Sequence, residues 1–312
     1  MTDVLRLTKA HGLGNDFLVA LESDNPQRLD RCVADPSIAV LLCDRRRGIG
    51  ADGVLYGRTG AAGAAGAAGA AGAAGADLEM VLHNADGSVA EISGNGIRCL
   101  AQAYLRASGR REGDVVIDTA AGRRVLSSAP TERLAVDNLR VDMGSVLAGP
   151  PLAPSASGWG AIHVASASVG NPHIVLHVES VDGIDIASEG PRLEADVAGG
   201  VNVHFLSVEG PDTIRLVHWE RGAGVTEACG SGATVSAFLA NQWGLVGAEV
   251  SVRMPGGEAT IDLREAAEGR IHLTGEAVHV ATVEVDLDAL VDALVDAAND
   301  ASTTDAEVAN AS

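Results

Sequence analysis

The chain has 312 residues, of which 46% are hydrophobic and only 3% are aromatic, so we expect two domains with mainly aliphatic cores. Its formal net charge of −20 disfavours binding to nucleic acid or to an anionic membrane surface, where Lys and Arg must neutralise phosphates. The sequence shows no apolar N-terminal segment of the secretory type and no apolar run long enough to cross a membrane, so a cytoplasmic protein is expected.

In chain order, the first half shows strand patterns, a low-complexity tract and one helix. Residues 53–56 and 78–82 are apolar runs typical of strands, and residues 60–76 repeat Gly and Ala without charged or bulky side chains. We therefore predict a low-complexity loop at 60–76 that joins two strands. A helix is predicted over about residues 96–108, because Gly109 stands where glycine commonly ends a helix.

The second half repeats this order and adds a C-terminal extension. A helix is predicted over about residues 232–243, again ended by a glycine, Gly244. Residues 276–286 are expected to form a strand that returns to the first half. Leu and Val recur at helical spacing over 287–295, which predicts a short amphipathic helix docked on the body or on a partner. Residues 299–312 are expected to be a disordered tail.

These elements predict an α+β fold of two pseudo-symmetric domains. Each domain is expected to be a mainly antiparallel sheet of short strands wrapped around one central helix. The first domain is assigned to residues 1–137 and the second to residues 138–275. The returning strand then occupies 276–286, and the acidic helix and tail occupy 287–312.

Two segments, 84–96 and 220–232, follow one pattern about 140 residues apart. In each, a polar residue lies nine positions before a small side chain, Ser93 or Cys229, that opens a Gly-x-Gly helix start. This spacing is too long for a solenoid and is typical of a duplicated domain with a site at the pseudo-twofold interface. Two such helix starts facing each other would hold one anion between two side chains that act as acid and base.

Cys229 is the first candidate for chemistry. The first N–H groups of a helix lack partners within it and carry the positive end of its dipole, so they can bind a carboxylate. The same field lowers the pKa of a cysteine at that position, which predicts a thiolate base near neutral pH. The other three cysteines are interpreted as reduced, buried thiols, because their spacing suits neither a disulfide framework nor a zinc site: Cys32, Cys43 and Cys99.

Ser93 has two interpretations at this stage. Serine is a good helix N-cap, and the repeat equally places this hydroxyl in the site opposite Cys229. A helix dipole stabilises an adjacent charge by about 0.3–1 kcal/mol, or up to ~2 kcal/mol when partly buried, which is too little to make an alkoxide. Donating a proton to a strongly basic carbanion is more feasible for a serine. Cys99 points roughly 120° away around the helix, so we do not expect it to replace Ser93.

Several motifs in order resemble the diaminopimelate epimerase family over residues 5 to 285. The motifs that carry this resemblance are His11-Gly-Leu-Gly-Asn-Asp-Phe17, Arg47-Gly-Ile-Gly-Ala-Asp-Gly53, Asn84-Ala-Asp-Gly-Ser88, Gly94-Asn-Gly96, Gly170-Asn-Pro-His173, Glu220-Arg-Gly-Ala-Gly224, Ala228-Cys-Gly-Ser-Gly232, Pro255-Gly-Gly257 and Thr274-Gly-Glu276.

The resemblance implies an isomerase that interconverts LL- and meso-diaminopimelate in lysine and peptidoglycan-precursor synthesis. The family's mechanism uses two bases and neither pyridoxal phosphate nor a metal, so no cofactor is expected. One cysteine removes the α-proton and another returns a proton on the opposite face. The resemblance also suggests a homodimer.

The resemblance assigns roles to named positions. Catalytic roles fall on Cys229, on Ser93, and on His173 and Glu220, which match polar residues beside the two catalytic thiols. Backbone amides are expected to hold the reacting carboxylate: those of Gly94, Asn95, Gly230 and Ser231. The reacting amino group would be held by Asn15 and Glu220. The distal end of the substrate would be bound by Asn84, Asn171, Asn202 and Arg221, with Arg221 as a bidentate clamp on the distal carboxylate.

Ser93 departs from the family, whose pattern has its first catalytic cysteine there. Three hypotheses follow. The first is an epimerase in which Cys229 serves one face and Ser93, a water or a relay serves the other. The second is a one-base lyase or isomerase acting on a related amino acid. The third is a non-catalytic amino-acid-binding relative.

Overall fold

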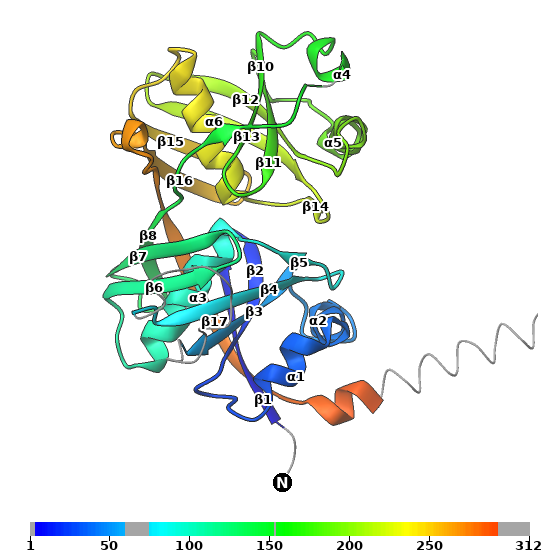
Figure 1. Ribbon diagram of the computed structural model, residues 1–312, viewed down its shortest axis with the longest axis vertical. Helices are drawn as coiled ribbons and strands as arrows, with labels where there is room; N and C mark the ends of the chain where they lie inside the picture. The colour runs from blue at the N-terminus through cyan, green and yellow to red at the C-terminus, as the bar shows by residue number, and fades with distance from the viewer. Residues whose placement is uncertain (1–3, 60–74, 153, 293–312) are drawn as a thin grey trace, which may run out of the picture.

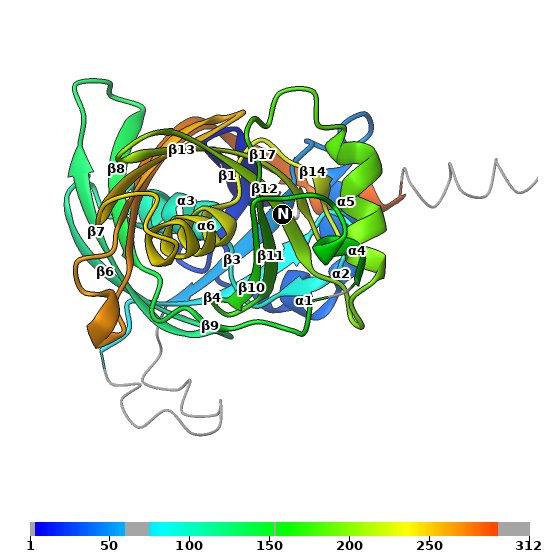
Figure 2. The ribbon, with the colours of Figure 1, turned by 90° about the horizontal axis from the view of Figure 1, so that it is seen from above.

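The computed structural model describes residues 4–59, 75–152 and 154–292. Two halves are stacked along the long axis, and each consists of strands around one long helix (Figure 1). These helices are α3 (Gly94–Ala107) in the first half and α6 (Gly230–Gln242) in the second. Seen from above, strands surround both helices (Figure 2). The predicted α+β fold with a sheet around each central helix is confirmed.

Among the described residues, eight strands of the first half lie around α3. They are β1 (Val4–Gly12), β2 (Asn15–Leu21), β3 (Gly53–Thr59), β4 (Leu78–Asn84), β5 (Val89–Ala90), β6 (Gly113–Thr119), β7 (Gly122–Pro130) and β8 (Val136–Asp142). The antiparallel pairing of β3 with β4 confirms the two strands expected around the Gly/Ala tract. Most of that predicted loop, residues 60–74, lies outside the described residues.

The second half repeats this arrangement around α6. Its strands are β9 (Leu147–Ala148), β10 (His163–Ser168), β11 (Pro172–His177), β12 (Asn202–Gly210), β13 (Thr213–Glu220), β14 (Gly224–Val225), β15 (Glu249–Met254) and β16 (Gly257–Asp262). A parallel pair, β2 with β3, has its counterpart in β11 with β12. A second parallel pair, β4 with β6, has its counterpart in β13 with β15. The repeated motifs therefore belong to equivalent places in two similar folds.

One strand joins the halves. β17 (His272–Asp286) pairs with β16 of the second half and with β8 and β1 of the first. In Figure 1 it runs from the upper half into the lower one. The last turns of the chain follow it, with residues 287–292 helical and Leu287 fully buried against the first half. The remainder of the predicted C-terminal helix and the predicted tail lie outside the described residues.

Both central helices end where the sequence predicts. Gly109 and Gly244 adopt left-handed φ values of 71° and 73°, a conformation that favours glycine. Each helix begins two residues earlier than predicted, at Gly94 and Gly230. The starts predicted from the sequence are too late because the first Gly-x pair was taken to lie outside the helix.

Within the described residues, four shorter helices that were not predicted from the sequence lie outside the sheets. They are α1 (Leu29–Ala34), α2 (Pro36–Cys43), α4 (Pro154–Ser157) and α5 (Ile186–Ala195), with a 3₁₀ turn at Ala266–Glu268. They cover two satellite cores: α1 and α2 pack on the outer faces of β1 to β3, and α5 packs on β12 and β13. None of the helices in the described ranges is long and apolar enough to cross a bilayer.

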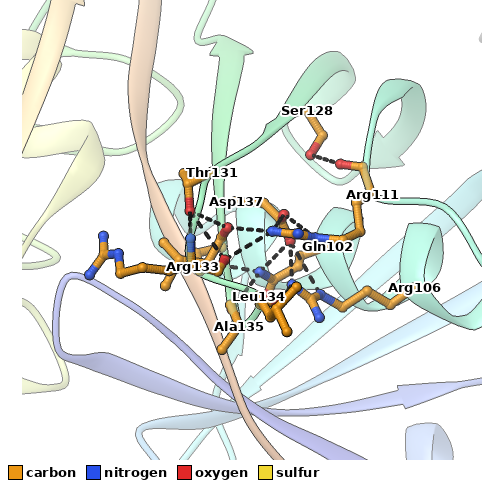
Figure 3. A network of polar contacts seen from close by, with 11 residues as sticks. Gln102, Arg106, Arg111, Ser128, Thr131, Arg133, Leu134, Ala135 and Asp137 are labelled. Atoms are coloured by element: carbon orange, nitrogen blue, oxygen red, sulfur yellow. Dashed lines mark hydrogen bonds and ion pairs between the residues drawn. The ribbon is translucent and has the colours of Figure 1, made fainter.

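A buried carboxylate fixes α3 within its sheet (Figure 3). Asp137 of β8 is 1% exposed and accepts hydrogen bonds from Gln102 at 2.8 Å, Arg106 at 2.7 Å and Arg111 at 2.9 Å. Gln102 also donates to the carbonyl of Ala277 on β17 at 2.8 Å. A buried charge is tolerated when it is paired and hydrogen-bonded in this way. The contacts hold α3 in one orientation, which determines where its N-terminus lies.

Candidate active site

The two central helices begin against each other. A Cβ atom built on Gly94 would lie 3.2 Å from the Cα of Gly230, and one built on Gly230 would lie 3.1 Å from the Cα of Gly94. Only glycine permits backbones to approach so closely. The first turns of α3 and α6 therefore meet, and the positive ends of two helix dipoles converge on one place. The sequence pattern predicted that these helix starts would face each other.

Ser93 and Cys229 occupy equivalent positions at these helix starts. Both have extended backbones, with φ and ψ of −129° and 122° for Ser93 and of −124° and 106° for Cys229. The Ser93 hydroxyl accepts from the Gly96 N–H at 3.0 Å, and the Cys229 thiol accepts from the Gly232 N–H at 3.4 Å. Capping and a place in the site were alternatives for Ser93 in the sequence analysis. In the structure Ser93 does both, since it caps α3 and also lines the cavity.

A cavity of about 380 Å³ opens in front of the two helix starts. Its walls include every site residue expected from the sequence except Cys229 and His173: Asn15, Asn84, Ser93, Gly94, Asn95, Asn171, Asn202, Glu220, Arg221, Gly230 and Ser231. Cys229 is 2% exposed and His173 is fully buried, so both lie behind that wall.

Glu220 lies beside the Cys229 thiol at the end of a chain of hydrogen bonds. The Thr226 hydroxyl donates to the Glu220 carboxylate, and His218 Nε2 is 3.0 Å from the same hydroxyl oxygen. The one proton of the Thr226 hydroxyl lies in its hydrogen bond to Glu220. The hydroxyl oxygen therefore accepts a hydrogen bond from the Nε2–H of His218. Burial lowers the pKa of His218 to about 4, so this imidazole is neutral. Thr226 and His218 were missed by the sequence analysis, although both stand within six residues of Glu220.

Burial raises the pKa of Glu220, and hydrogen bonds from Thr226 and Cys229 lower it in part. The pKa of the Cys229 thiol is shifted in the direction opposite to the sequence prediction. Burial, followed by the neighbouring charge of Glu220, raises its pKa well above the ordinary value, and the contacts with Ser231 and Gly232 oppose this only partly. The predicted lowering by the helix dipole is therefore wrong for this structure, because desolvation of the thiolate outweighs the dipole.

His173 reaches the cavity through Asn171. Its Nε2 is 2.8 Å from the side-chain oxygen of Asn171, and its Nδ1 is 2.9 Å from Nε2 of His204. An amide oxygen only accepts, so His173 carries its proton on Nε2 and accepts from His204 at Nδ1. Burial, followed by the charge of Arg221, lowers the pKa of His173 to about 3. The pair of imidazoles is therefore neutral. Of these two histidines, only His173 was predicted from the sequence to belong to the site.

The side-chain amides around the cavity are held in fixed orientations. Asn15 donates to Asp52 at 2.6 Å, and Asn95 donates to Asn15 at 3.2 Å and to the carbonyl of Ala228 at 2.7 Å. The last of these bonds joins the two helix starts across the interface between the halves. Asp52, which the sequence analysis quoted only within a motif, thus orients a residue of the cavity wall.

The polar residues expected at the distal end of a substrate are also tied to the backbone. Asn202 donates to the carbonyl of Pro172 at 2.8 Å and accepts from the N–H of Arg221 at 3.0 Å. The Arg221 guanidinium donates to the carbonyl of Gly199 at 3.2 Å. Asn84 donates to the hydroxyl of Ser88 at 3.0 Å. These bonds hold amide and guanidinium groups along one wall of the cavity.

The remaining cysteines differ from Cys229. Cys32, Cys43 and Cys99 are buried in hydrophobic clusters, as predicted, and none of them caps α3 or α6. Burial raises the pKa of Cys99 to about 12. A thiol of this kind behaves as a small hydrophobic side chain.

Comparison with known proteins identifies the family of this chain. A sequence model of the family described as "Diaminopimelate epimerase" matches residues 7–148 and 165–280. The chain belongs to this family. A diaminopimelate epimerase of a Synechocystis species is 34% identical over 302 residues, which cover 91% of this chain and 99% of the relative. A diaminopimelate epimerase of Parabacteroides distasonis is 35% identical over 288 residues, which cover 90% and 97%.

Among solved structures, a hydroxyproline epimerase from Agrobacterium vitis with bound trans-4-hydroxy-L-proline is similar in fold. The TM-score is 0.66 at 17% sequence identity, and the match covers 91% of this chain and 94% of the other. At this identity the likeness supports the fold alone. Membership of the family rests on the sequence matches, which span both halves and both helix starts.

Proposed function

We propose that the protein is an isomerase that converts LL-diaminopimelate to meso-diaminopimelate by proton transfer at the α-carbon. The observation that carries the proposal is the contact between Gly94 and Gly230, which brings two equivalent helix starts together with Ser93 and Cys229 as their caps. An α-carbon held between these caps would present one face to each. Family membership indicates the reaction, and the two-sided arrangement suits an inversion at one carbon.

The carboxylate of the reacting centre is assigned to the convergent helix starts. The amide groups of Gly94, Asn95, Gly230 and Ser231 line the cavity there. Loss of the α-proton shifts negative charge onto this carboxylate, and preorganised N–H groups stabilise such charge in the transition state. Asn15 and Glu220 are assigned to the amino group. The polar wall formed by Asn84, Asn171, Asn202 and Arg221 is assigned to the distal amino-carboxylate.

The raised pKa of Cys229 determines how proton transfer begins. A buried thiol beside a carboxylate starts protonated, so we propose that it passes its proton to Glu220 before it acts as a base. The thiolate then takes the α-proton, and Ser93 or a water or relay beside it supplies a proton to the opposite face. The proton held by Glu220 returns through solvent to this donor, which restores the starting protonation of the site. Ser93 accepts from Gly96 through its oxygen, which leaves its own proton free to donate. In the reverse direction the protonated thiol is the donor.

Conversion and exchange in heavy water test the proposal. Purified, reduced protein is incubated with LL- or meso-diaminopimelate, and conversion and deuterium incorporation at the α-carbon are followed. We expect conversion and exchange from both stereoisomers. Exchange from only one isomer without conversion would support the second candidate, a one-base lyase or isomerase, which the hydroxyl at Ser93 favours. No exchange from either isomer would contradict both.

We propose that the enzyme acts in lysine and peptidoglycan-precursor synthesis, in the cytoplasm, as a homodimer and without pyridoxal phosphate. The acid–base groups around the cavity belong to the chain itself, and this supports a reaction that needs no cofactor. Measurement of activity after exhaustive dialysis against a chelator and a carbonyl reagent tests the last point.

Thr226→Val is predicted to shift the pH dependence of the reaction. The hydroxyl of Thr226 lowers the pKa of Glu220, so its removal raises that pKa further while preserving side-chain volume. If the reaction begins with Glu220 ionised, the acidic limb of the profile of kcat against pH moves to higher pH. Thr226→Ser retains the hydroxyl and is expected to keep the wild-type profile. An unchanged acidic limb in Thr226→Val would contradict the role of Glu220.

A further inference from the structure

One arginine directly behind the first helix start is buried without a carboxylate partner. Arg98 of α3 is 0% exposed and is the largest fully buried side chain of the described residues. Its guanidinium donates to the carbonyl of Gly94 at 2.9 Å and to the side-chain oxygen of Asn95 at 2.8 Å, while Nε has no partner. Among the described residues no carboxylate oxygen lies within ion-pair distance of it.

The space around this guanidinium is shaped for it by two glycines. A Cβ on Gly12 of β1 would lie 3.1 Å from a terminal nitrogen of Arg98, and one on Gly275 of β17 would lie 3.1 Å from its central carbon. Strands from opposite ends of the chain thus leave room for a flat guanidinium on the inner side of α3. Any larger residue at either glycine would press on it.

Burial of an unpaired charge opposes folding, so an apolar side chain would be the more stable choice at this position unless the charge has a use. Burial lowers the pKa of Arg98 only to about 10, and the group stays positively charged at neutral pH. Its two bonded partners, Gly94 and Asn95, both line the cavity. The uncompensated charge therefore lies one residue layer behind the place assigned to the substrate carboxylate.

We propose that Arg98 is a positioning residue and that the carboxylate of the bound substrate is the counter-ion of its buried charge. This inference rests on the proposed function for the identity of the substrate, although an anion of another kind at the same helix starts would respond to the same charge. The guanidinium holds the first turn of α3 through Gly94 and Asn95. Its field favours the negative charge that increases on the carboxylate as the α-proton leaves.

A line of hydrogen bonds transmits this orientation across the site. Arg98 donates to the oxygen of Asn95, which leaves the Asn95 nitrogen to donate to Asn15 and to the carbonyl of Ala228. Asn15 in turn donates to Asp52. Every amide in the line is oriented by its neighbour, with a cation at one end and a carboxylate at the other. Loss of Arg98 would free the Asn95 amide to turn. The hydrogen bond from Asn95 to Ala228, which joins the two helix starts, would then be weakened.

Two variants of Arg98 separate its charge from its shape. Arg98→Lys keeps a positive charge, and Arg98→Gln keeps hydrogen-bond donors without charge. Arg124→Gln is the matched control, because Arg124 also has an unpartnered Nε and no carboxylate within ion-pair distance but lies on β7 away from the cavity. We expect Arg98→Gln to lower kcat for exchange about tenfold, less than the ~10²–10³ of a donor in direct contact. Arg98→Lys should retain more activity, and Arg124→Gln should match the wild type.

A second readout does not depend on diaminopimelate. Sodium acetate is compared with sodium chloride at equal ionic strength for its effect on the unfolding midpoint. Acetate should raise the midpoint of the wild type, of Arg98→Lys and of Arg124→Gln more than that of Arg98→Gln. If the wild type neither converts nor exchanges diaminopimelate, the proposed function fails while the acetate comparison still decides the role of Arg98.

A folded Arg98→Gln protein with wild-type kcat, or with a wild-type response to acetate, overturns the inference. A merely structural role would lower the unfolding midpoint of Arg98→Gln without changing either readout. If Arg98→Gln does not fold, Arg98→Lys decides alone. A lowered kcat with a retained acetate response is then expected, and an unchanged kcat overturns the inference.

Discussion

Cys229→Ala is expected to lower the rate of α-proton exchange by about 10²- to 10⁴-fold, the usual contribution of a positioned acid or base. The thiol is the group at the α6 start to which we assign removal of the proton from carbon, because Gly232 only donates to it and Ser231 carries a hydroxyl. Conversion should fall together with exchange, since inversion needs both faces of the α-carbon. Deuterium incorporation followed by proton NMR measures the effect.

Cys99→Ala provides the matched control for this loss. Cys99 is also a buried cysteine near a helix start, but it lies inside α3 and packs in the hydrophobic cluster, whereas Cys229 caps α6. Its replacement should leave kcat unchanged. Exchange that survives Cys229→Ala at the wild-type rate would refute the assignment of Cys229 as a base. Unequal unfolding midpoints of the two variants would first require correction for the fraction folded.

Ser93→Cys is expected to raise the rate of conversion, by up to about 10²-fold, the lower end of the acid–base range. A thiol, with an ordinary pKa of about 8.5, loses its proton far more readily than a serine hydroxyl does. Because Ser93 and Cys229 have nearly the same backbone angles and cap their helices in the same way, a thiol at 93 can be accommodated without rebuilding the turn. Initial rates of conversion in both directions measure the gain.

Ser93→Ala is the companion to that substitution. It removes both the cap and the hydroxyl, so we expect a loss of about 1 kcal/mol in stability and a loss of exchange on that face. Equal rates in the native protein and in Ser93→Cys would indicate that a water or a relay, rather than residue 93, serves the second face. Native protein without conversion, with activity gained in Ser93→Cys, would point to an intact substrate site with a different native reaction.

Much of the fold follows from local patterns. The central helices end at Gly109 and Gly244 because glycine alone adopts the left-handed backbone there without cost, and this can be recognised in a sequence. The helix starts were placed two residues late. The outer helices α1, α2, α4 and α5 were missed, since they are short and their burial depends on packing against strands elsewhere in the chain. The domain boundaries after residues 137 and 275 remain predictions.

The residues that line the cavity were also largely predictable from the sequence, whereas the pKa shift of Cys229 was not. The repeat and the family resemblance picked out Asn15, Ser93 and Glu220, which the fold brings to one cavity. The same reasoning predicted a lowered pKa for Cys229. The dipole term can be inferred from position in the helix, but desolvation depends on what covers the thiol in three dimensions, and here it is the larger effect.

By itself, the sequence determined the repeated helix starts, the residues that cap and end the two helices, and the family, because each is a matter of residue type at short spacing. Only the tertiary structure decided that Gly94 touches Gly230, that Cys229 is buried beside Glu220, and that Arg98 lies charged and unpaired behind the first turn. Contacts, desolvation and missing partners are properties of residues far apart in the chain, and folding alone brings them together.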